Sequence, residues 1–308
     1  MNESILITGA NIGLGKETAR QLALRKETKK VILFCRNQAK ADAAKRDLEE
    51  QTGKRIFEII IGDVSDANSV RGAVEKIKEP IDALILNAGG MIGKTAAKIT
   101  PSGMNELAAT NILGHVVLVE ELIKHDKLKK AVLSVSAEAV PGVKLLGMKP
   151  VSMRTSSVDE FAAVLDGSYF GNKFDVTQAY GYVKYLMTMW TLSMARKYPE
   201  LKFVVMSPGN TKGTLAPDSL PPAMRFMLKN FMMPIVFPLM GGMVHELEVG
   251  AKRFVDGVSD ERYKSGVFYA SKEGKLSGDV VDQSTFFNVL KNTTFQDNAN
   301  EAIHHFIN

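Results

Sequence analysis

The sequence predicts an α/β fold built on a doubly wound parallel sheet of about seven strands. Three observations lead to this prediction: apolar runs rich in β-branched residues recur along the chain, amphipathic stretches separate the early runs, and a glycine-rich turn follows the first run. Strands that are apolar almost throughout are typical of parallel sheets covered by helices on both faces. Ligands of such folds bind beyond the carboxyl ends of the strands.

The predicted strands are Ile5–Ile7, Val31–Cys35, Ile56–Ile61, Ile81–Leu86, Ala131–Val135, Phe203–Met206 and Val267–Tyr269. Apolar residues at helical spacing predict helices over Lys16–Arg25, Gln38–Gln51 and Ala67–Lys78, and a later helix that contains Tyr180. The chain has no internal repeat, low-complexity tract or linker, so we expect one domain over residues 1–308.

Two long segments interrupt this alternation, at about 141–178 and about 215–244. Connections of this length are usually binding loops or lids. The second segment is rich in Met, whose flexible side chain suits an irregular apolar substrate, so we expect a substrate lid there; helices packed on the core are the alternative. Its apolar run Phe231–Val244 is 14 residues long, and a membrane span needs roughly 18. We expect no span, and peripheral membrane contact through the lid stays open.

Composition excludes several functional classes. The 308 residues are 45% hydrophobic and 24% charged, as in a globular protein with a sizeable core. The net charge of +5 comes from scattered Lys and Arg, which argues against nucleic-acid binding. The single cysteine, Cys35, fits a reducing compartment, and the first strand begins near residue 4, so we expect no signal peptide and a cytoplasmic protein. The five histidines have no metal-ligand spacing, which predicts no metal.

A glycine-rich turn joins the first strand to the first helix. Its pattern is Gly9-x-x-x-Gly13-x-Gly15, with Asn11, Ile12 and Leu14 between the glycines. Glycines let the backbone turn tightly, and the free N–H groups of a helix N-terminus bind phosphate. The spacing differs from the G-x-G-x-x-G of long-chain dehydrogenases, and Glu17 excludes a Mg²⁺-binding Walker loop. We expect a pyrophosphate site; a glycine turn without a ligand is the alternative.

The residue after the second strand bears on the choice of dinucleotide. Arg36 stands where an NAD site usually has an acidic side chain for the ribose 2′-hydroxyl, and no acidic residue follows before Asp42. A guanidinium binds a 2′-phosphate through paired hydrogen bonds, so NADP(H) is favoured over NAD(H). A solvated arginine is the alternative.

Tyr180 and Lys184 form a candidate acid–base pair. They lie four residues apart, on one face of the predicted helix, and a nearby ammonium favours the phenolate form of tyrosine. Ser136 ends the fifth strand, on the ligand side of the sheet. Ser134 is a rival for its role, but we expect the side chain of Ser134 to point to the opposite face of the sheet.

These features resemble the short-chain dehydrogenase/reductase family, whose fold is the Rossmann fold, over roughly residues 3–214. The matching pieces, in chain order, are Thr8-Gly9-x-x-x-Gly13-x-Gly15, Asp63-Val64, Asn87-Ala88-Gly89, Asn111-Ile-Leu-Gly-His, Ser136, Tyr180-x-x-x-Lys184 and Pro208-Gly209. The resemblance implies that the glycines cradle the pyrophosphate, that Asp63 and Val64 flank the adenine, and that Asn87 and Ala88 line the adenine ribose.

The resemblance also implies catalytic roles. Tyr180 would be the acid in carbonyl reduction and the base in alcohol oxidation, and Lys184 with the nicotinamide charge would lower its pKa. Lys184 would also hold the nicotinamide ribose, and Ser136 would hydrogen-bond the substrate oxygen. Asn111 would hold a water that connects Lys184 to solvent; stabilisation of a helix kink is the alternative role of Asn111.

Two departures from the family pattern matter. Ser136 and Tyr180 are 44 positions apart, whereas typical members have about a dozen. The extra segment is similar to that of monomeric carbonyl reductases, where it covers the helix face that other members use to form tetramers; this predicts a monomer or homodimer. After the Pro-Gly pair, Gly213 stands where the family has a threonine that contacts the carboxamide, which leaves Thr211 or Thr214 for that contact.

We therefore expect an NADP(H)-dependent reductase of aldehydes or ketones with a medium-to-large apolar substrate, or an enzyme that oxidises the corresponding alcohol. A retinol- or steroid-type dehydrogenase is one alternative. A protochlorophyllide reductase-like enzyme is another, which the lack of a cysteine after Tyr180 disfavours. A non-catalytic NADP(H)-sensing protein is a third, although a sensor has no need of Asn111, Ser136, Tyr180 and Lys184 together.

Overall fold

The computed structural model describes residues 2–142, 149–212 and 244–307. Within these residues eight strands form one sheet in the order β3-β2-β1-β4-β5-β6-β7-β8. The strands are β1 Ser4–Thr8, β2 Lys30–Cys35, β3 Phe57–Ile61, β4 Ile81–Leu86, β5 Leu128–Val135, β6 Lys202–Met206, β7 Val267–Ser271 and β8 Val280–Asp282. The first seven are parallel, and β8 runs antiparallel to β7.

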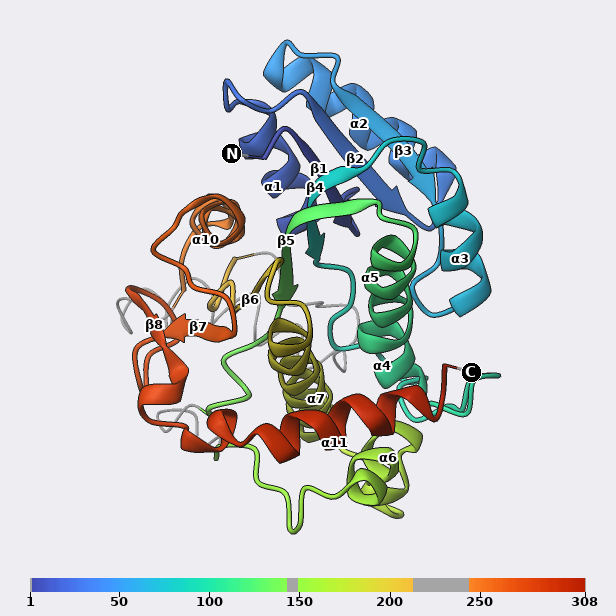
Figure 1. Cartoon of the computed structure of the whole chain (residues 1–308), viewed down its shortest axis with the longest axis vertical. Helices are drawn as coiled ribbons and strands as arrows, with labels where there is room; N and C mark the ends of the chain where they lie inside the picture. The colour runs from blue at the N-terminus through green and yellow to red at the C-terminus, as the bar shows by residue number, and fades with distance from the viewer. Residues whose placement is uncertain (1, 143–148, 213–243, 308) are drawn as a thin grey trace, which may run out of the picture.

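Helices connect the strands and cover both faces of the sheet (Figure 1). The α-helices are α1 Gly13–Ala23, α2 Gln38–Thr52, α3 Ala67–Glu75, α4 Glu106–Ala108, α5 Gly114–Lys124, α6 Val158–Asp166, α7 Val176–Lys197, α10 Leu247–Ser259 and α11 Thr293–His304. The shorter turns are the π-turn η1 Ala109–Leu113 and the 3₁₀ turns η3 Ser168–Phe170, η6 Gln283–Thr285 and η7 Asn288–Lys291. Across the described ranges, no helix is long and apolar enough to cross a membrane.

The predicted doubly wound α/β fold is confirmed, and all seven predicted strands are present. Strand β8 was not predicted, because three residues at a sheet edge carry no periodic signal. The first helix begins at Gly13 rather than at Lys16, so the glycine turn itself forms the helix N-terminus.

The core lies in two layers, one on each face of the sheet. One layer packs β-strand side chains against α3, α5, α6, α7 and α11, and the other packs them against α1, α2 and α10. Consecutive residues Ile5, Leu6 and Ile7 are each 0% exposed because their alternating side chains enter both layers. This double burial fixes the strand ends that carry the functional loops.

The described part of the long insertion adds a second layer of helix outside α7. Helix α6 comes from this insertion and contacts both α7 and α11, and α11 crosses α7 (Figure 1). Asn105 joins α6 to the N-terminus of α4: its Nδ2 donates to the carbonyls of Val164 (2.9 Å) and Leu165 (2.8 Å), and its Oδ1 accepts from Ala108 N–H. The predicted lid at about 215–244 lies outside the described residues except for its last residue.

Replacing Asn105 with Ala should destabilise the fold strongly. Asn105 is 0% exposed, so the substitution leaves buried backbone groups of α4 and α6 without partners, at about 2–4 kcal/mol. Asn292 is the control, because it caps α11 by accepting from Phe295 N–H at an exposed position, where Ala costs about 1 kcal/mol. Urea unfolding measures both, and equal losses would contradict the bridging role of Asn105.

Candidate active site

The site lies where β1 and β4 are neighbours in the sheet but lead to helices on opposite faces. Thr8 ends β1, and its hydroxyl oxygen accepts hydrogen bonds from the backbone N–H groups of Asn87 and Ala88, both at 2.9 Å. The side-chain amide of Asn87 donates in return to Thr8 O at 2.9 Å. These bonds lock the loops after β1 and β4 to each other.

The glycine turn leaves no room for side chains on its inner side. A Cβ on Gly15 would lie 2.4 Å from the carbonyl oxygen of Gly9 and 2.5 Å from Nδ2 of Asn87, and Gly9 has a φ of +67°. Helix α1 starts at Gly13 with Ile12 at its N-cap, and an isoleucine side chain cannot accept a hydrogen bond. The first N–H groups of α1 therefore keep their capacity to bind an anion.

A basic hollow of about 730 Å³ adjoins this turn. It is lined by Asn11, Ile12, Lys16, Arg36, Asn37, Lys40, Ala43 and Ala44. Three cations meet here, and none of these lining residues is acidic. Arg36 was predicted from the sequence, whereas Lys16 and Lys40 were not; their positions at the starts of α1 and α2 were the available signal. Lys16 also pairs with Asp47.

The loop after β3 is held against the start of α5. The carboxylate of Asp63 accepts hydrogen bonds from the backbone and hydroxyl of Ser65, at 2.9 and 2.7 Å. The carbonyl of Val64 accepts from Gly114 N–H at 2.8 Å, and a Cβ on Gly114 would lie 2.3 Å from that oxygen. Asp63 and Val64 thus occupy a fixed loop at the carboxyl edge of the sheet.

Tyr180 and Lys184 lie on α7, and Nζ of Lys184 is 5.7 Å from the centroid of the Tyr180 ring. Lys184 is 3% exposed, and its Nζ donates to the carbonyl of Val135 at 3.0 Å. Burial raises the pKa of Tyr180 to about 12 and lowers that of Lys184 to about 8. The expected lowering of the phenol pKa by the ammonium is therefore absent in this arrangement, because desolvation dominates.

Ser134 in β5 and Ser136, which directly follows that strand, both face α7. Ser136 Oγ lies 2.9 Å from Oγ1 of Thr188, and Thr191 donates to Ser134 Oγ at 2.8 Å. The expectation that Ser134 points to the opposite face is wrong, because residues two apart in a strand share a face. Thr188 sits one helical turn after Lys184 and donates to its carbonyl at 2.8 Å. The hydroxyl of Ser136 is thus linked to the helix that carries Lys184.

Asn111 lies in the π-turn η1, and its side chain holds the loop after β4. Its Nδ2 donates to the carbonyls of Leu107 (2.8 Å) and Gly90 (3.1 Å), and its Oδ1 accepts from Gly90 N–H at 2.9 Å. A Cβ on Gly89 would lie 2.5 Å from that Oδ1, so the loop approaches Asn111 closely. These bonds favour a structural role for the side chain and leave the backbone carbonyl, 3.2 Å from Nδ1 of His115, as the group available inside the site.

The loop after β6 is anchored by a buried ion pair. Arg253 donates to the carbonyl of Ser207, which precedes Pro208, and lies 3.6 Å from the carboxylate of Glu138. Gly209 has a φ of +73°, and a Cβ there would be 2.9 Å from Nη1 of Arg253. Glu138 and Arg253 were not predicted from the sequence, because they lie far apart in the chain.

Thr211 is 1% exposed, and its Oγ1 lies 3.0 Å from Nε2 of His245. Its hydroxyl is therefore engaged with the segment that precedes α10. Thr214, the other candidate for the carboxamide contact, lies outside the described residues, as does Gly213.

The sequence profile described as short chain dehydrogenase matches residues 3–140. The chain is 32% identical to dehydrogenase/reductase SDR family member 12 of Bos taurus over 213 residues, 67% of this chain and 60% of that protein. It is 30% identical to the chloroplastic protochlorophyllide reductase of Daucus carota over 306 residues, 91% of this chain and 74% of that protein. The chain belongs to the short-chain dehydrogenase/reductase family.

Solved structures show the same fold. The NADPH-bound carbonyl reductase from chicken fatty liver superposes with a TM-score of 0.58 at 18% identity, covering 90% of this chain and 99% of that one. The short-chain dehydrogenase/reductase family consists of oxidoreductases that use nicotinamide cofactors. The chain spans about three fifths of the length of its bovine relative.

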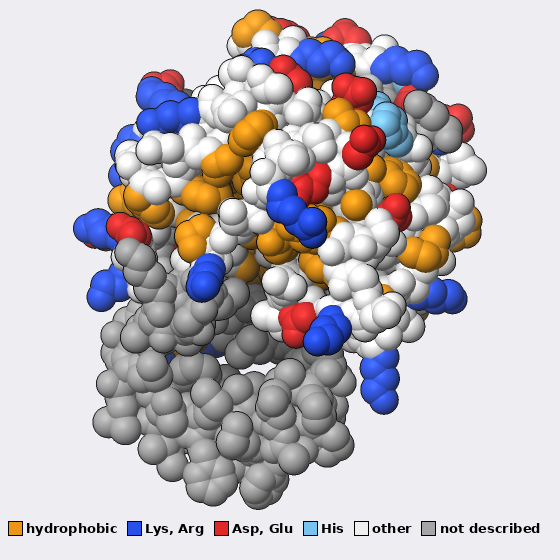
Figure 2. Space-filling view, turned by 90° about the horizontal axis from the view of Figure 1, so that it is seen from below, with side chains coloured by type: hydrophobic (Ala, Val, Ile, Leu, Met, Phe, Trp, Pro, Cys, Tyr) orange, Lys and Arg blue, Asp and Glu red, His pale blue; other side chains and the backbone are white. Residues whose placement is uncertain are grey.

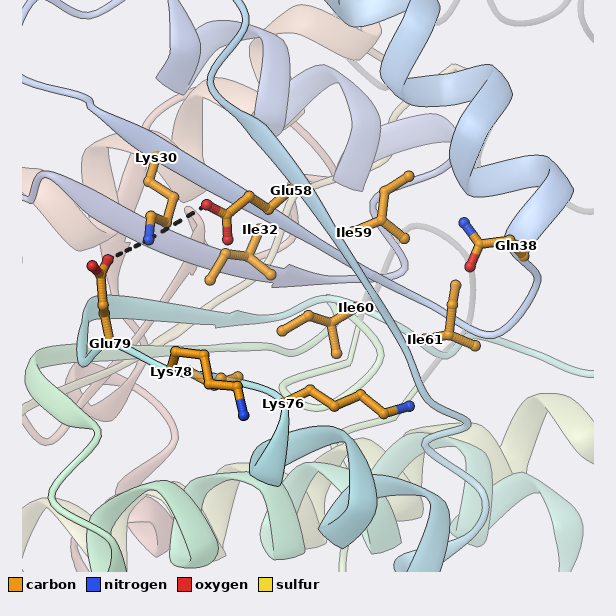
Figure 3. Close-up of a pocket in the computed structure, with 11 residues that line it drawn as sticks. Lys30, Ile32, Gln38, Glu58, Ile59, Ile60, Ile61, Lys76, Lys78 and Glu79 are labelled. Atoms are coloured by element: carbon orange, nitrogen blue, oxygen red, sulfur yellow. Dashed lines mark hydrogen bonds and ion pairs between the residues drawn. The ribbon is translucent and has the colours of Figure 1, made fainter.

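A second hollow, of about 520 Å³, lies along the edge strand β3 rather than at the switch between β1 and β4 (Figure 3). Lys30 bridges its charged rim, with Nζ 3.4 Å from Glu58 and 2.5 Å from Glu79. The charges of Lys30, Glu58 and Glu79 therefore offset one another. On the face seen in Figure 2, Lys and Arg are interspersed with Asp and Glu instead of forming one basic field.

No cluster of three or more His, Cys, Asp or Glu side chains suited to a metal occurs in the part of the chain that the structure describes. The absence of a metal in the whole protein stays a prediction.

Replacing Lys184 with Met should stabilise the protein at neutral pH. The pKa of Lys184 falls from 10.5 to about 8 on folding, so the unfolded chain binds more protons between these values and stability rises with pH there. At pH 7 the buried ammonium costs on the order of 3 kcal/mol, partly offset by its bond to Val135. The gain should shrink as the pH approaches about 10.

Urea unfolding at both pH values measures this effect. Lys197→Met, at the exposed end of the same helix, is the control and should change the unfolding free energy by less than about 0.5 kcal/mol. A Lys184→Met protein that is less stable than wild type at neutral pH would contradict the burial cost.

Proposed function

We propose that this protein is an NADP(H)-dependent oxidoreductase that reduces the carbonyl of a medium-to-large apolar aldehyde or ketone, or oxidises the corresponding alcohol. One observation carries the proposal. The half-buried Tyr180 and the buried Lys184 lie on one helix, α7, at the carboxyl edge where the turn Gly9–Gly15 presents an uncapped helix N-terminus. An acid–base group and an anion site on one sheet edge are what hydride transfer from a dinucleotide requires.

The residues present fit NADP(H). The glycine turn is open at Gly13, where a Cβ would meet nothing within 4 Å, and the N–H groups there have no side-chain acceptor from the N-cap. The adjoining hollow gathers Arg36, Lys16 and Lys40, which suits a 2′-phosphate better than a free hydroxyl. When bound, the cofactor supplies the hydride. The remaining proposed contacts are Asp63, Val64, Asn87, Ala88, Gly89, Pro208, Gly209 and Thr211.

In the proposed mechanism Tyr180 donates its phenolic proton to the carbonyl oxygen of the substrate, and Ser136 hydrogen-bonds that oxygen. The phenolate left behind is stabilised by the ammonium of Lys184, which the carbonyl of Val135 holds in place. A pKa near 8 lets Lys184 exchange protons close to neutral pH. Proton return from solvent to Lys184 would pass through a water, and the backbone carbonyl of Asn111 would hold that water by accepting its hydrogen bond.

The same proposal covers the organisation of the chain. We propose one catalytic domain over residues 1–308, with a substrate lid at about 215–244. The layer of α6 and α11 over α7 supports a monomer or homodimer, because it occupies the outside of the helix that carries the site. We further propose a cytoplasmic protein that acts on a small molecule and binds neither nucleic acid nor a metal, with peripheral membrane contact as the open alternative.

A protochlorophyllide-type reductase is the second candidate. The match to the carrot enzyme covers 91% of this chain and favours it. The single cysteine lies at Cys35, so none follows Tyr180, which speaks against it. Loss of NADPH absorbance separates the two candidates. It is measured with aldehydes, ketones and quinones graded by size, and with protochlorophyllide under illumination.

Replacing Tyr180 with Phe should lower turnover by about 10³-fold or more while NADPH still binds, because only the proton donor is lost. Tyr182→Phe is the control: its hydroxyl donates to Ser152 O, away from the site, and its loss should leave turnover nearly unchanged. Steady-state rates and NADPH fluorescence titration give both quantities. Unchanged turnover in Tyr180→Phe would refute the mechanism, and a wild type that binds NADPH without any turnover would support a sensor.

Replacing Arg36 with Leu should raise the dissociation constant of NADPH by about 10- to 100-fold and that of NADH by less than about threefold, since only NADPH has the 2′-phosphate. Arg46→Leu on the exposed side of α2, outside the basic hollow, is the control and should affect neither. Equal weakening of both dinucleotides would remove the argument for NADP(H).

A further inference from the structure

His115 is a buried imidazole that the proposed mechanism does not use. It lies on α5, one helical turn after Asn111, and is 1% exposed. Its Nε2 is 3.0 Å from the hydroxyl oxygen of Thr8, and its Nδ1 is 3.2 Å from the carbonyl oxygen of Asn111. One ring therefore contacts the residue that begins the glycine turn and the π-turn beside Lys184.

The hydroxyl of Thr8 determines the state of Nε2. Its oxygen already accepts two hydrogen bonds, from the N–H groups of Asn87 and Ala88 at 2.9 Å. Both lone pairs are used, and one proton remains to be donated. Nε2 of His115 at 3.0 Å is a better acceptor for it than the carbonyl of Ile85 at 3.4 Å. Nε2 must then carry no proton.

The carbonyl of Asn111 determines the state of Nδ1. A carbonyl oxygen only accepts, so Nδ1 of His115 must carry the proton. A single neutral tautomer thus satisfies both contacts. A second ring proton would place a third donor on Thr8 and a new cation near Lys184 on α7; burial and that ammonium lower the pKa of His115 to about 3.

We infer that His115 is a positioning residue for cofactor binding, fixed in the Nδ1–H tautomer with its Nε2 accepting the proton of Thr8. By taking that proton, the imidazole turns both lone pairs of Thr8 toward Asn87 and Ala88. The loops after β1 and β4 then keep the separation that the cofactor edge needs. The inference rests on the proposed use of NADP(H) at this edge.

Two amide variants separate the two contacts of the ring. In His115→Gln the longer side chain carries its carbonyl oxygen to the position of Nε2, where it still accepts from Thr8. In His115→Asn the shorter side chain keeps a donor at the position of Nδ1 for Asn111 and loses the contact with Thr8. We expect His115→Asn to weaken NADPH binding about fivefold, and His115→Gln to restore it to within about twofold of wild type.

Fluorescence titration with NADPH measures the affinities, and urea unfolding measures stability alongside. His125→Asn, at the exposed C-cap of α5, is the control and should match wild type. A role in packing alone would lower affinity in step with stability in both variants, and that result would overturn the inference.

Nitrogen NMR of the ¹⁵N-histidine-labelled full chain tests the tautomer without any ligand. We expect one ring with a protonated Nδ1 and a bare Nε2, unchanged between about pH 5 and about pH 9, and absent from both His115 variants. A protonated Nε2, or a titration in that range, would overturn the inference. Failure of the wild type to bind NADPH would refute the proposed function instead, and the tautomer test would still decide the state of His115.

Discussion

The hydroxyl of Thr8 is the contact on which the site depends most. Parallel strands that part at a switch point leave backbone N–H groups at their carboxyl ends, and buried N–H groups need acceptors. Thr8 accepts from two consecutive N–H groups of the loop after β4, and Asn87 closes the contact by donating back to Thr8 O. The glycine turn is built against this joint, because the same amide of Asn87 would touch a Cβ at Gly15.

Burial sets the chemistry on the other side of the site. Tyr180 and Lys184 have pKa values shifted in opposite directions by one cause, since desolvation disfavours the charged form of each. Because burial favours the neutral forms of both side chains, Lys184 without further positive charge is poorly suited to stabilise the phenolate of Tyr180. The positive charge of the nicotinamide beside Tyr180 would reverse this balance, so in the proposed mechanism the protonation of Tyr180 depends on bound cofactor. Burial of the Lys184 ammonium lowers the free energy of unfolding, and the same burial produces the shifted pKa that the proposed mechanism uses.

Much of the fold was predictable because parallel strands buried on both faces read as continuous apolar runs. The same pattern does not predict β8, because this strand is short and lies at an edge of the sheet. Within the site, the sequence predicted residues that belong to one local motif, but it did not predict contacts between motifs that lie far apart in the chain. His115 has no local signal that names Thr8 as its partner, and Lys16 and Lys40 join Arg36 only once the sheet brings their helices together.

The orientation of Ser134, which was predicted wrongly, bears on the role proposed for Ser136. Both serines face α7, so strand alternation cannot choose between them, but Ser136 follows the carboxyl end of β5 whereas Ser134 lies inside the strand. Thr188 has a single hydroxyl proton for two acceptors, the carbonyl of Lys184 and Ser136, just as Thr191 has one for the carbonyl of Met187 and Ser134. In the first case Ser136 donates to Thr188 and has no proton for a substrate. In the second case Thr188 donates to Ser136, whose proton is then directed to the substrate oxygen. The role proposed for Ser136 therefore requires the hydroxyl of Thr188 to rotate away from the carbonyl of Lys184 and to donate to Ser136. A methyl group in place of that hydroxyl has no proton to donate.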